Sequence, residues 1–407
     1  MNWMGKAQQI CRQNVKVNGV AAKLYSKFRE DGLRCCILKG QGNALMYPNP
    51  YSRTPGDIDV WVNASREQIT EYAKKHFVIG DDIRLQHLET SLDGVPVELH
   101  FFPCSMNNPI YHARLQKWFR RNADLQCSHI VGLPDGAGDI AIPTTAFNVI
   151  YQLTHLYHHF FDEGIGMRQI IDYFLVVNDF SKNVFLDTDF SNQPVNFSNH
   201  PVPLSKEGST FSPSPSSMVF TPPSVPPFPG DRNLRSGDVT APSRCSEPLR
   251  SKDGGPSKVS PDCAGWDRRG VSGDIASDAS VSSAFTTDSS ASTALVVVQR
   301  ELKYLGLWKF AGAVMYVLKE VLGLSEEKMI VPVDEKRGRL LLAEILDGGN
   351  FGKHFTKYAG FTHQSMGKKY FLKIWRNMHF VRYYPAEALC EPLFRTWHFF
   401  WRLKYKK

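Results

Sequence analysis

The sequence lacks long hydrophobic runs. No stretch of its 407 residues approaches the roughly 20 consecutive apolar residues that a membrane-spanning helix needs. The N-terminal stretch MNWMGKAQQICRQNVKVNGV contains neither the apolar segment nor the small-residue cleavage site of a secretory signal. Both absences argue against a membrane-spanning or secreted protein, and we expect this protein in the cytoplasm.

Cysteines are few, and they are scattered. The eight cysteines form no CxxC pair and no cysteine–histidine spacing that would hold zinc. Most of them are therefore expected to be reduced residues of the core. The net charge of +8 suits a protein that handles phosphate, but it lies within the ordinary range. The length, with 42% hydrophobic residues, predicts two or three domains with a substantial core.

Two acidic residues carry the strongest functional signal. Within the stretch LKGQGNALMYPNPYSRTPGDIDVWV (residues 38–62), Asp57 and Asp59 flank one apolar residue at the start of an apolar run. Successive side chains of a strand point to opposite faces, so the two carboxylates share one face while Ile58 and Val60 enter the core. Carboxylate oxygens suit Mg²⁺, whose shell is completed by water and substrate phosphate. The pair predicts a magnesium site, although an isolated Asp-x-Asp is more often a surface turn.

A glycine turn precedes these acids. The apolar run 33–38 predicts a buried strand that leads into the segment 39–42 (KGQG), and a short helix is expected at 43–47. Backbone N–H groups at a helix start can bind an anion, so this turn predicts a seat for phosphate. Arg53, which precedes the acids, either binds phosphate as a second cation or forms a local salt bridge. The candidate nucleotide-binding residues are Lys39, Gly40, Gln41, Arg53 and Gly56.

A third acid is expected on a later strand. After a strand at 57–62 and a helix at 66–76 capped near Ser65, strands are expected near 83–89 and 95–102, joined at Asp93-Gly94. In the last strand, Glu98 and His100 alternate with apolar residues and share the polar face. His100 either orients a metal-bound water or is a hydrogen-bonded strand histidine.

Three carboxylates are the minimum framework for a two-metal clamp that activates a nucleophile and stabilises a leaving group. The predicted catalytic residues and metal ligands are Asp57, Asp59 and Glu98. Two Mg²⁺ ions are expected, with Mn²⁺ as the alternative. Lys39 and the Gly40 turn would bind the β and γ phosphates of a nucleoside triphosphate, with Arg53 as a second cation.

From residue 111 onward the pattern predicts helices. They are expected at 143–161, 167–177, 295–322 and 335–347, and in a final region at 370–406. The first contains His155, His158 and His159, which either contact substrate phosphate or base or are partly exposed; a zinc role lacks the acid of HExxH. In the second, Arg168 and Asp172 are expected to pair one turn apart.

The region at 181–292 is rich in serine and proline and has no sustained hydrophobic period, so it is interpreted as a disordered insert. The predicted domains are a catalytic domain at 1–115, a helical domain at 116–180 and 293–407, and the insert between its two parts. The terminal WHFFWRLKYKK is either a membrane-surface helix or a helix that packs its rings on the domain, and packing is favoured.

Several motifs together resemble a known family. They are LKGQGNALMYPNP, RTPGDIDVWV, VELH, the histidine-containing helix and GIGMRQIIDYF, and after the insert LKYLGLWKFAGAVMYVLKEVLGL and DEKRGRLLLAEILDGGNFG. They are similar to the uncharacterised nucleotidyltransferase family of the DNA polymerase β-like superfamily, in its Bacteroidetes-type members. The resemblance implies an α+β core, with a short mixed sheet and flanking helices, and metal-dependent nucleotide transfer.

The resemblance assigns Asp57 and Asp59 to the paired metal acids, Glu98 to the third acid and Gly40 to the phosphate turn. The superfamily commonly has Gly-Ser at that turn, whereas this sequence has Lys39-Gly40, as in abortive-infection-type nucleotidyltransferases. The implied activity is transfer of a nucleoside monophosphate from a nucleoside triphosphate to an unidentified hydroxyl on protein, RNA or a small molecule. The alternatives are a catalytically silent module that binds nucleotide or a partner, and an RNA-tailing or tRNA-modifying enzyme. No RNA-binding motif is visible for the latter.

Overall fold

The computed structural model describes residues 3–80, 84–183, 287–349 and 366–405, all within one compact unit. The predicted insert at 181–292 lies outside the described residues except at its two ends. There, helix α6 (Met167–Asn183) and helix α7 (Thr287–Tyr304) both extend into the predicted insert. Both helices are therefore longer than the hydrophobic pattern indicated.

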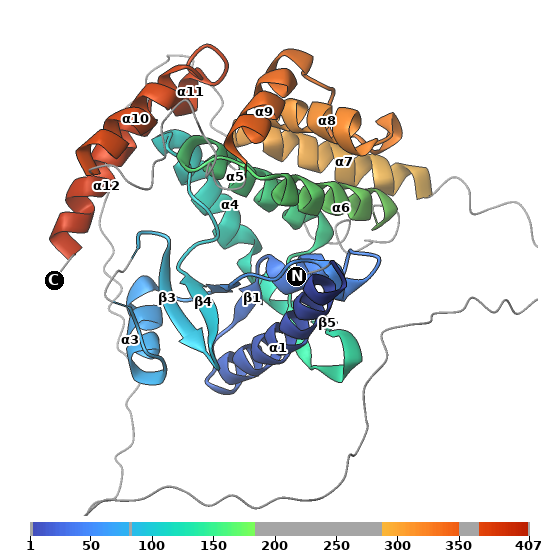
Figure 1. Ribbon diagram of the computed structural model, residues 1–407, viewed down its shortest axis with the longest axis vertical. Coiled ribbons are helices and arrows are strands. Elements are labelled where there is room, and N and C mark those ends of the chain that lie inside the picture. The colour runs from blue at the N-terminus through green and yellow to red at the C-terminus, as the bar shows by residue number, and fades with distance from the viewer. Residues whose placement is uncertain (1–2, 81–83, 184–286, 350–365, 406–407) are drawn as a thin grey trace, which may run out of the picture. The chain divides into compact units, whose positions relative to one another are not determined.

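The N-terminal part contains a mixed four-stranded sheet, which confirms the predicted α+β class (Figure 1). Its strand order is β1-β2-β4-β3, with β2 and β4 parallel and the two outer pairs antiparallel. The strands are β1 (Cys35–Ile37), β2 (Ile58–Val62), β3 (His87–Leu92) and β4 (Val95–His100). The parallel pair in the centre places equivalent side chains of β2 and β4 next to each other.

The strand predicted at 83–89 begins later, at His87. Its register follows from the two-residue turn at Asp93 and Gly94, which both have positive φ (50° and 72°), as a tight hairpin turn requires. This turn pairs Leu92 with Val95 and continues to the pair His87 and His100. The hairpin was predicted correctly, but the start of its first strand was not.

Helices complete the N-terminal part. Long helix α1 (Trp3–Glu30) contributes Leu24 and Phe28 to a core shared with the inward side chains of the sheet. Helix α3 (Arg66–His76) has the predicted bounds because Ser65 and Gln68 form a capping box at its start. Helix α2 (Gly40–Ala44) begins earlier than the predicted 43–47 and is followed by a 3-10 turn at Pro50–Ser52.

A small hairpin lies within the region that was expected to be helical. After helix α4 (Pro109–Ser128), strands β5 (Ile130–Gly132) and β6 (Asp139–Ala141) pair antiparallel, and β6 contacts α1 and β1. Strands of three residues are too short to show an alternating pattern, which explains why the prediction missed them.

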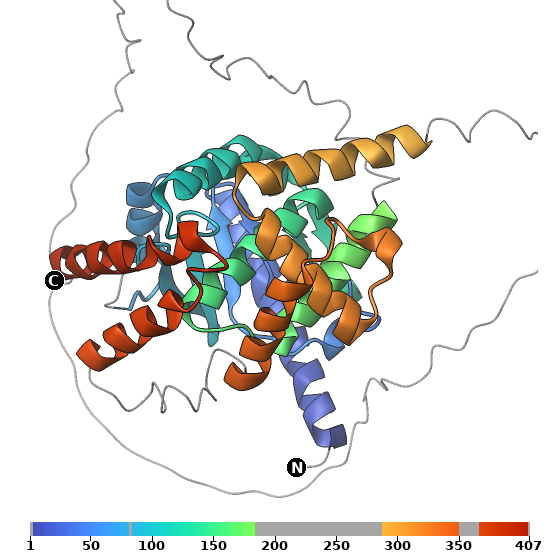
Figure 2. The ribbon, with the colours of Figure 1, turned by 90° about the horizontal axis from the view of Figure 1, so that it is seen from above.

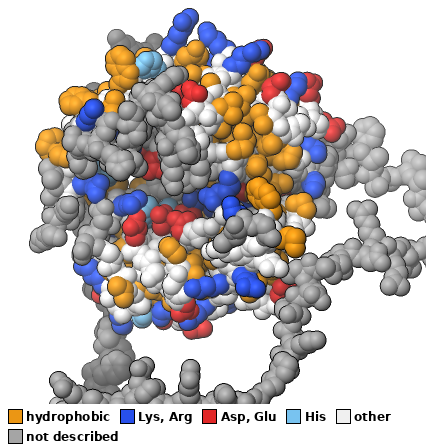
Figure 3. Space-filling view, viewed as in Figure 1, with side chains coloured by type: hydrophobic (Ala, Val, Ile, Leu, Met, Phe, Trp, Pro, Cys, Tyr) orange, Lys and Arg blue, Asp and Glu red, His pale blue; other side chains and the backbone are white. Residues whose placement is uncertain are grey.

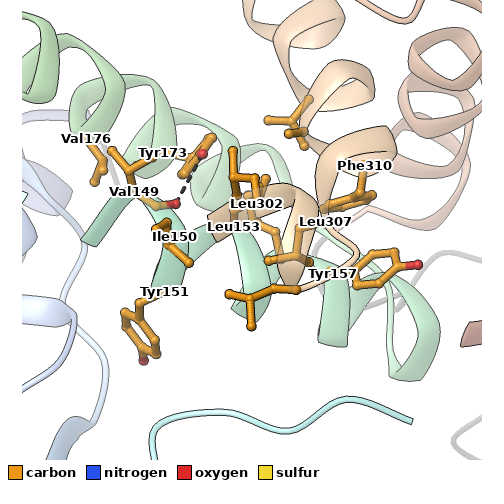
Figure 4. Close-up of a cluster of buried hydrophobic side chains, with 14 of the residues drawn as sticks. Val149, Ile150, Tyr151, Leu153, Tyr157, Tyr173, Val176, Leu302, Leu307 and Phe310 are labelled. Atoms are coloured by element: carbon orange, nitrogen blue, oxygen red, sulfur yellow. Dashed lines mark hydrogen bonds between the residues drawn. The ribbon is translucent and has the colours of Figure 1, made fainter. Parts of the chain in front are cut away.

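A second hydrophobic core joins the helices that follow. It is built around helix α5 (Thr145–Asp162) and includes α6, α7, α8 (Trp308–Leu322) and α9 (Glu335–Gly348). Figure 4 shows Tyr157 near Phe310 in this core, and the Tyr173 hydroxyl donating to the carbonyl of Val149 at 3.2 Å. The rings of Tyr157 and Phe310 lie 4.7 Å apart. This core holds residues on both sides of the undescribed segment together.

The single helix predicted at 295–322 is wrong. The chain breaks between α7 and α8 at Gly306, whose φ of 74° lies in the left-handed region. A Cβ atom at Gly306 would lie 2.6 Å from the ring of Tyr111, so a side chain does not fit there. The helix end predicted at Gly323 is confirmed, with the left-handed conformation of a C-cap.

The C-terminal region consists of helices α10 (Met366–Met378), α11 (Pro385–Ala388) and α12 (Glu391–Tyr405), and α10 contacts α12 (Figure 1, Figure 2). The favoured packing of the terminal rings is wrong for Trp397 and Phe400, which are 51% and 63% exposed. Trp401 does pack on another part of the chain, because the Arg66 guanidinium at the start of α3 lies 5.6 Å from its ring. Among the described helices, none is long and apolar enough to cross a membrane.

Candidate active site

A cavity of about 320 Å³ lies where the sheet meets helices α5 and α6. Figure 3 shows acidic, basic and histidine side chains gathered around a hollow on this face. Its lining includes nearly all of the residues predicted from the sequence, namely Lys39, Gly40, Arg53, Gly56, Asp57, Asp59 and Glu98. The local motifs thus converge on one place, although they come from separate strands and loops.

The acids meet because of strand register. In the parallel pair of β2 and β4, Asp59 lies directly beside Glu98, and Asp57 precedes β2 by one residue. Neighbouring strands are about 4.8 Å apart and side chains at paired positions share a face, so Asp59 and Glu98 project side by side. The inference that the third acid stands on a neighbouring strand agrees with this register.

Asp59 contacts Lys39 and His100. Its Oδ1 lies 2.9 Å from Lys39 Nζ and 3.1 Å from His100 Nε2, and the side chain is only 4% exposed. Burial alone would raise the pKa of Asp59, but Lys39 and His100 outweigh burial and hold this pKa well below its usual range. Asp59 is therefore an anion whose charge is met inside the cavity.

Asp57 behaves in the opposite way. Desolvation within the cavity and the nearby charges of Asp59 and Glu98 raise the pKa of Asp57 to about 6. Among the residues that the structure describes, no cation forms a salt bridge with Asp57 as Lys39 does with Asp59. Two carboxylates with pKa values pushed apart are typical of sites that bind cations or move protons.

Glu98 faces two histidines. Its Oε2 lies 3.2 Å from His100 Nε2 and 3.4 Å from His87 Nδ1. Burial acts to raise the pKa of Glu98, but the hydrogen bond from His100 leads to a net lowering. Burial and then His100 lower the pKa of His87 to about 4, so His87 is neutral near pH 7.

Sequence reasoning missed His87. It lies opposite His100 in the β3–β4 hairpin. Counting back from the turn at Asp93-Gly94 pairs 92 with 95 and hence 87 with 100, so this turn contained the signal that could have found it. The error in the start of the strand hid this pairing.

Lys39 links the sheet to α5. Its Nζ lies 2.9 Å from Asp59 and also 2.9 Å from His155 Nε2. Burial acts to lower the pKa of Lys39, but Asp59 outweighs it and raises this pKa, so the ammonium is charged. Next to it, Gly40 has a φ of 49°, a conformation that favours glycine. Lys39 is thus the cation closest to the acids.

Gln41 does not line the cavity. Its side chain is 3% exposed and its amide donates to Asn18 Oδ1. Gln41 therefore secures the turn to helix α1, and any contact with nucleotide would have to come from its backbone. Its predicted role in binding remains a prediction.

Arg53 forms a buried salt bridge. Its Nε and Nη2 donate to the two carboxylate oxygens of Asp172 at 3.0 and 2.9 Å, and Tyr47 donates to the same carboxylate at 2.7 Å. The predicted pair of Arg168 and Asp172 is wrong, because Arg53 reaches Asp172 from the loop before β2. The guanidinium of Arg53 is therefore largely committed to Asp172.

Arg168 is the better placed arginine for an anion. It lines the cavity, its Nη1 donates to the Thr54 carbonyl at 3.5 Å, and its buried Nε has no hydrogen-bond partner in the described structure. A buried donor without a partner is uncommon and marks a place where a ligand can bind.

The three histidines of α5 line the same cavity. His155 Nε2 lies 3.2 Å from His159 Nε2, as expected from their spacing of one turn. Burial lowers the pKa of all three histidines, and that of His159 to about 3. The α5 side of the cavity therefore offers neutral imidazoles near pH 7.

The rim at the end of α5 is tied to the C-terminal helices. Asp162 accepts hydrogen bonds from Lys373 of α10 at 2.9 Å and Arg395 of α12 at 3.2 Å. Burial would raise the pKa of Asp162, but these two cations outweigh it and lower the pKa. Residues more than 200 positions apart in sequence thus shape one edge of the site.

A comparison with known protein families matches the part of the chain that contains this site. A family model described as "Uncharacterised nucleotidyltransferase" matches residues 1–191, so this part of the chain is similar to that family. Every residue that lines the cavity lies within the match. The resemblance of residues 293–407 to the same family lies outside this match.

The fold also shows a distant likeness to a solved structure. It is similar to an antigenic nucleotidyltransferase-like protein from Paracoccidioides brasiliensis, with 16% identity and a TM-score of 0.26. The likeness covers 40% of this chain and 75% of that chain. No curated protein matches the sequence.

Proposed function

We propose that this protein is a Mg²⁺-dependent nucleotidyltransferase that transfers a nucleoside monophosphate from a nucleoside triphosphate to a hydroxyl acceptor. The observation that carries the proposal is the register of β2 and β4, which places Asp59 beside Glu98 in a cavity that Asp57 and Lys39 also line. The family match supports a nucleotide as the substrate.

The donor set fits magnesium. Asp57, Asp59 and Glu98 supply carboxylate oxygens, the ligands that Mg²⁺ prefers, and all three line the cavity. Lys39 and His100 hold the pKa of Asp59 low, so this carboxylate is ionised as a metal ligand must be. Mg²⁺, when bound, would neutralise the phosphates and activate the attacking hydroxyl.

The residues of the chain have separate tasks in this reaction. The acceptor oxygen forms a bond to the α-phosphorus while the bond from that phosphorus to pyrophosphate breaks in line. The hydroxyl proton passes to the carboxylate of Glu98. Lys39 Nζ and the unpartnered Nε of Arg168 would donate to the oxygens of the leaving pyrophosphate, where negative charge develops.

The test is a transfer assay with the full-length protein. It is incubated with Mg²⁺, each nucleoside triphosphate labelled on the α-phosphate, and a lysate as the source of acceptors, and released pyrophosphate and labelled products are measured. We expect Mg²⁺-dependent release that the double variant Asp57→Asn and Asp59→Asn abolishes. Undiminished transfer in a folded double variant would contradict the proposal, and binding without any transfer would favour a silent binding module.

Asp59→Asn leaves Lys39 without its main partner and can unfold the protein. The single variant Asp57→Asn avoids this problem, because Asp57 is exposed and its carboxylate has no salt bridge among the described residues. The matched control is Glu71→Gln, which neutralises an exposed acid on α3 outside the cavity lining. We expect this control to retain full transfer.

A further inference from the structure

Two histidines and one acid meet on the hairpin of β3 and β4. One ligand atom from each of His87, Glu98 and His100 lies within 4.8 Å of the others. Glu98 and His100 are two residues apart on β4 and share a face, and His87 is paired with His100 across the hairpin. The rigid register of two strands therefore presents the three side chains together.

The distances from Glu98 to the two histidines fit a small tetrahedral ion. His87 Nδ1 and His100 Nε2 lie 3.4 and 3.2 Å from Glu98 Oε2. Ligands bound to zinc at its usual bond lengths are separated by about 3.3 Å in a tetrahedron. The octahedral shell of Mg²⁺ would bring neighbouring ligands to about 2.9 Å, which is closer than either distance.

His87 lies close to two acids without a hydrogen bond to either: its Nδ1 is 3.4 Å from Glu98 Oε2 and its Nε2 is 3.9 Å from Glu89 Oε1. Its side chain is only 12% exposed, and neither ring nitrogen has a hydrogen-bond partner in the described structure. Buried polar atoms nearly always form hydrogen bonds in folded proteins, so an imidazole without one beside two carboxylates supports a metal ion between the histidine and an acid.

We propose that His87, Glu98 and His100 form a binding site for a divalent transition-metal ion, with Zn²⁺ as the ion that fits best. Imidazole suits zinc and its neighbours, whereas Mg²⁺ takes oxygen ligands. Two histidines with one glutamate leave a fourth position open to solvent. Glu98 also belongs to the proposed Mg²⁺ site, but metal binding at the hairpin does not depend on nucleotidyl transfer.

A proton is the competing occupant. His100 Nε2 now faces both Asp59 Oδ1 at 3.1 Å and Glu98 Oε2 at 3.2 Å, so the hydrogen on this nitrogen fills part of the same space. A metal ion would replace that hydrogen, and its binding should release a proton into solution. An ion pair of His100 with the two acids, and no metal, is the alternative that the test must distinguish.

The experiment is a titration of the full-length protein, freed of metal by a chelator, with Co²⁺ as a visible probe for a zinc site. We expect one equivalent to bind with the absorption of tetrahedral Co²⁺, proton release, and displacement by Zn²⁺ but not by equal Mg²⁺. His87→Gln should weaken binding by about 100-fold or more, since it removes a ligand rather than a supporting group.

Three further variants make the result specific. His87→Cys should keep the metal and add a thiolate-to-cobalt charge-transfer band, which identifies position 87 as a ligand even if His87→Gln folds poorly. His76→Gln, at a histidine outside the cavity lining, should bind Co²⁺ normally. Asp57→Asn should also bind Co²⁺, although it is expected to lose transfer, so failure of this site and failure of the proposed function are distinguishable.

Two results would overturn the inference. One is Co²⁺ binding that is no tighter than that of Mg²⁺, without a tetrahedral spectrum. The other is a tetrahedral spectrum that is unchanged in His87→Gln and lacks the thiolate band in His87→Cys, which would assign the ion to other histidines such as those of α5.

Discussion

The two walls of the cavity differ in charge. The sheet wall carries the acids Asp59 and Glu98, with Lys39 bound to Asp59. The α5 wall carries histidines that burial keeps neutral near pH 7, such as His155 and His159. In the proposed reaction, the metal ions would therefore lie against the sheet wall, and the phosphates would lie between Lys39 and Arg168. The neutral histidines of α5 suit uncharged hydrogen-bonding groups of a substrate.

The largest effect should follow from removing charge on the sheet wall. We expect Asp57→Asn to reduce the rate of transfer by about 1000-fold, which corresponds to about 4 kcal/mol, because it removes a ligand that acts on charge in the transition state. The measurement is the rate of pyrophosphate release at saturating Mg²⁺ and nucleotide. A reduction of less than 10-fold, with Glu71→Gln at the level of the unmodified protein, would show that the acids do not define this wall.

The second effect concerns the link between the sheet wall and α6. Arg53 from the loop before β2 and Asp172 from α6 are both 7% exposed and joined by two hydrogen bonds. Arg53→Met should lower the free energy of unfolding by about 3 kcal/mol, because Asp172 is left as a buried charge without its partner. Denaturant unfolding measures this change.

The double variant Arg53→Met with Asp172→Leu is the control for the same pair. It should lose less stability than the summed losses of the two single variants, because the double variant leaves no unpaired buried charge at either position. Additive losses would show that the salt bridge does not join the sheet to α6. If Arg53 instead serves the phosphates, Arg53→Met would leave stability unchanged and weaken nucleotide binding.

Much of the sheet wall was predictable from the sequence, because its signals are local. Asp57 and Asp59 alternate with apolar residues, Glu98 alternates in the same way, and the Ser65 cap defines the next helix. These patterns depend only on residues within a few positions of one another. The α+β class followed from them together with the family resemblance.

The remaining features depend on pairings that local spacing does not contain. Arg53 forms a salt bridge with Asp172, 119 positions away in the sequence, so the expected pair of Arg168 and Asp172 within α6 does not form. The ring of Tyr111, far away in the chain, leaves no room for a side chain at Gly306, where the helix breaks. His87 was missed because its pairing depends on where the hairpin begins. Tertiary contacts determine each of these features.

The third effect tests the neutral wall by pH. The pKa of His159 is lowered by burial from 6.5 to about 3, so the folded protein binds fewer protons than the unfolded chain between these values. Stability contributed by the neutral ring is present above pH 6.5 and is lost as the pH falls toward 3. We expect His159→Gln to reduce the loss of stability between pH 6.5 and 4 by about 2 kcal/mol. An unchanged pH profile would mean that this histidine is charged in the folded protein.

The smallest effect has the opposite sign and comes from the sheet wall. The pKa of Asp57 is raised from 3.8 to about 6, so in metal-free protein the folded state binds more protons than the unfolded chain between these values. Stability from the protonated carboxyl is present below pH 3.8 and is lost as the pH rises through 6. Because the side chain is exposed, solvent reduces this contribution to about 1 kcal/mol or less.

Asp57→Asn, which resembles the protonated acid, should therefore make the metal-free protein slightly more stable at pH 7 while it removes transfer. Thermal unfolding at pH 7 with a chelator present, compared with Glu71→Gln, measures the difference. A gain in stability with a loss of function is expected where like charges are held together for a ligand rather than for the fold. If Asp57→Asn destabilised the protein instead, the carboxylate would have a structural partner, and the sheet wall would differ less from the α5 wall than their charges indicate.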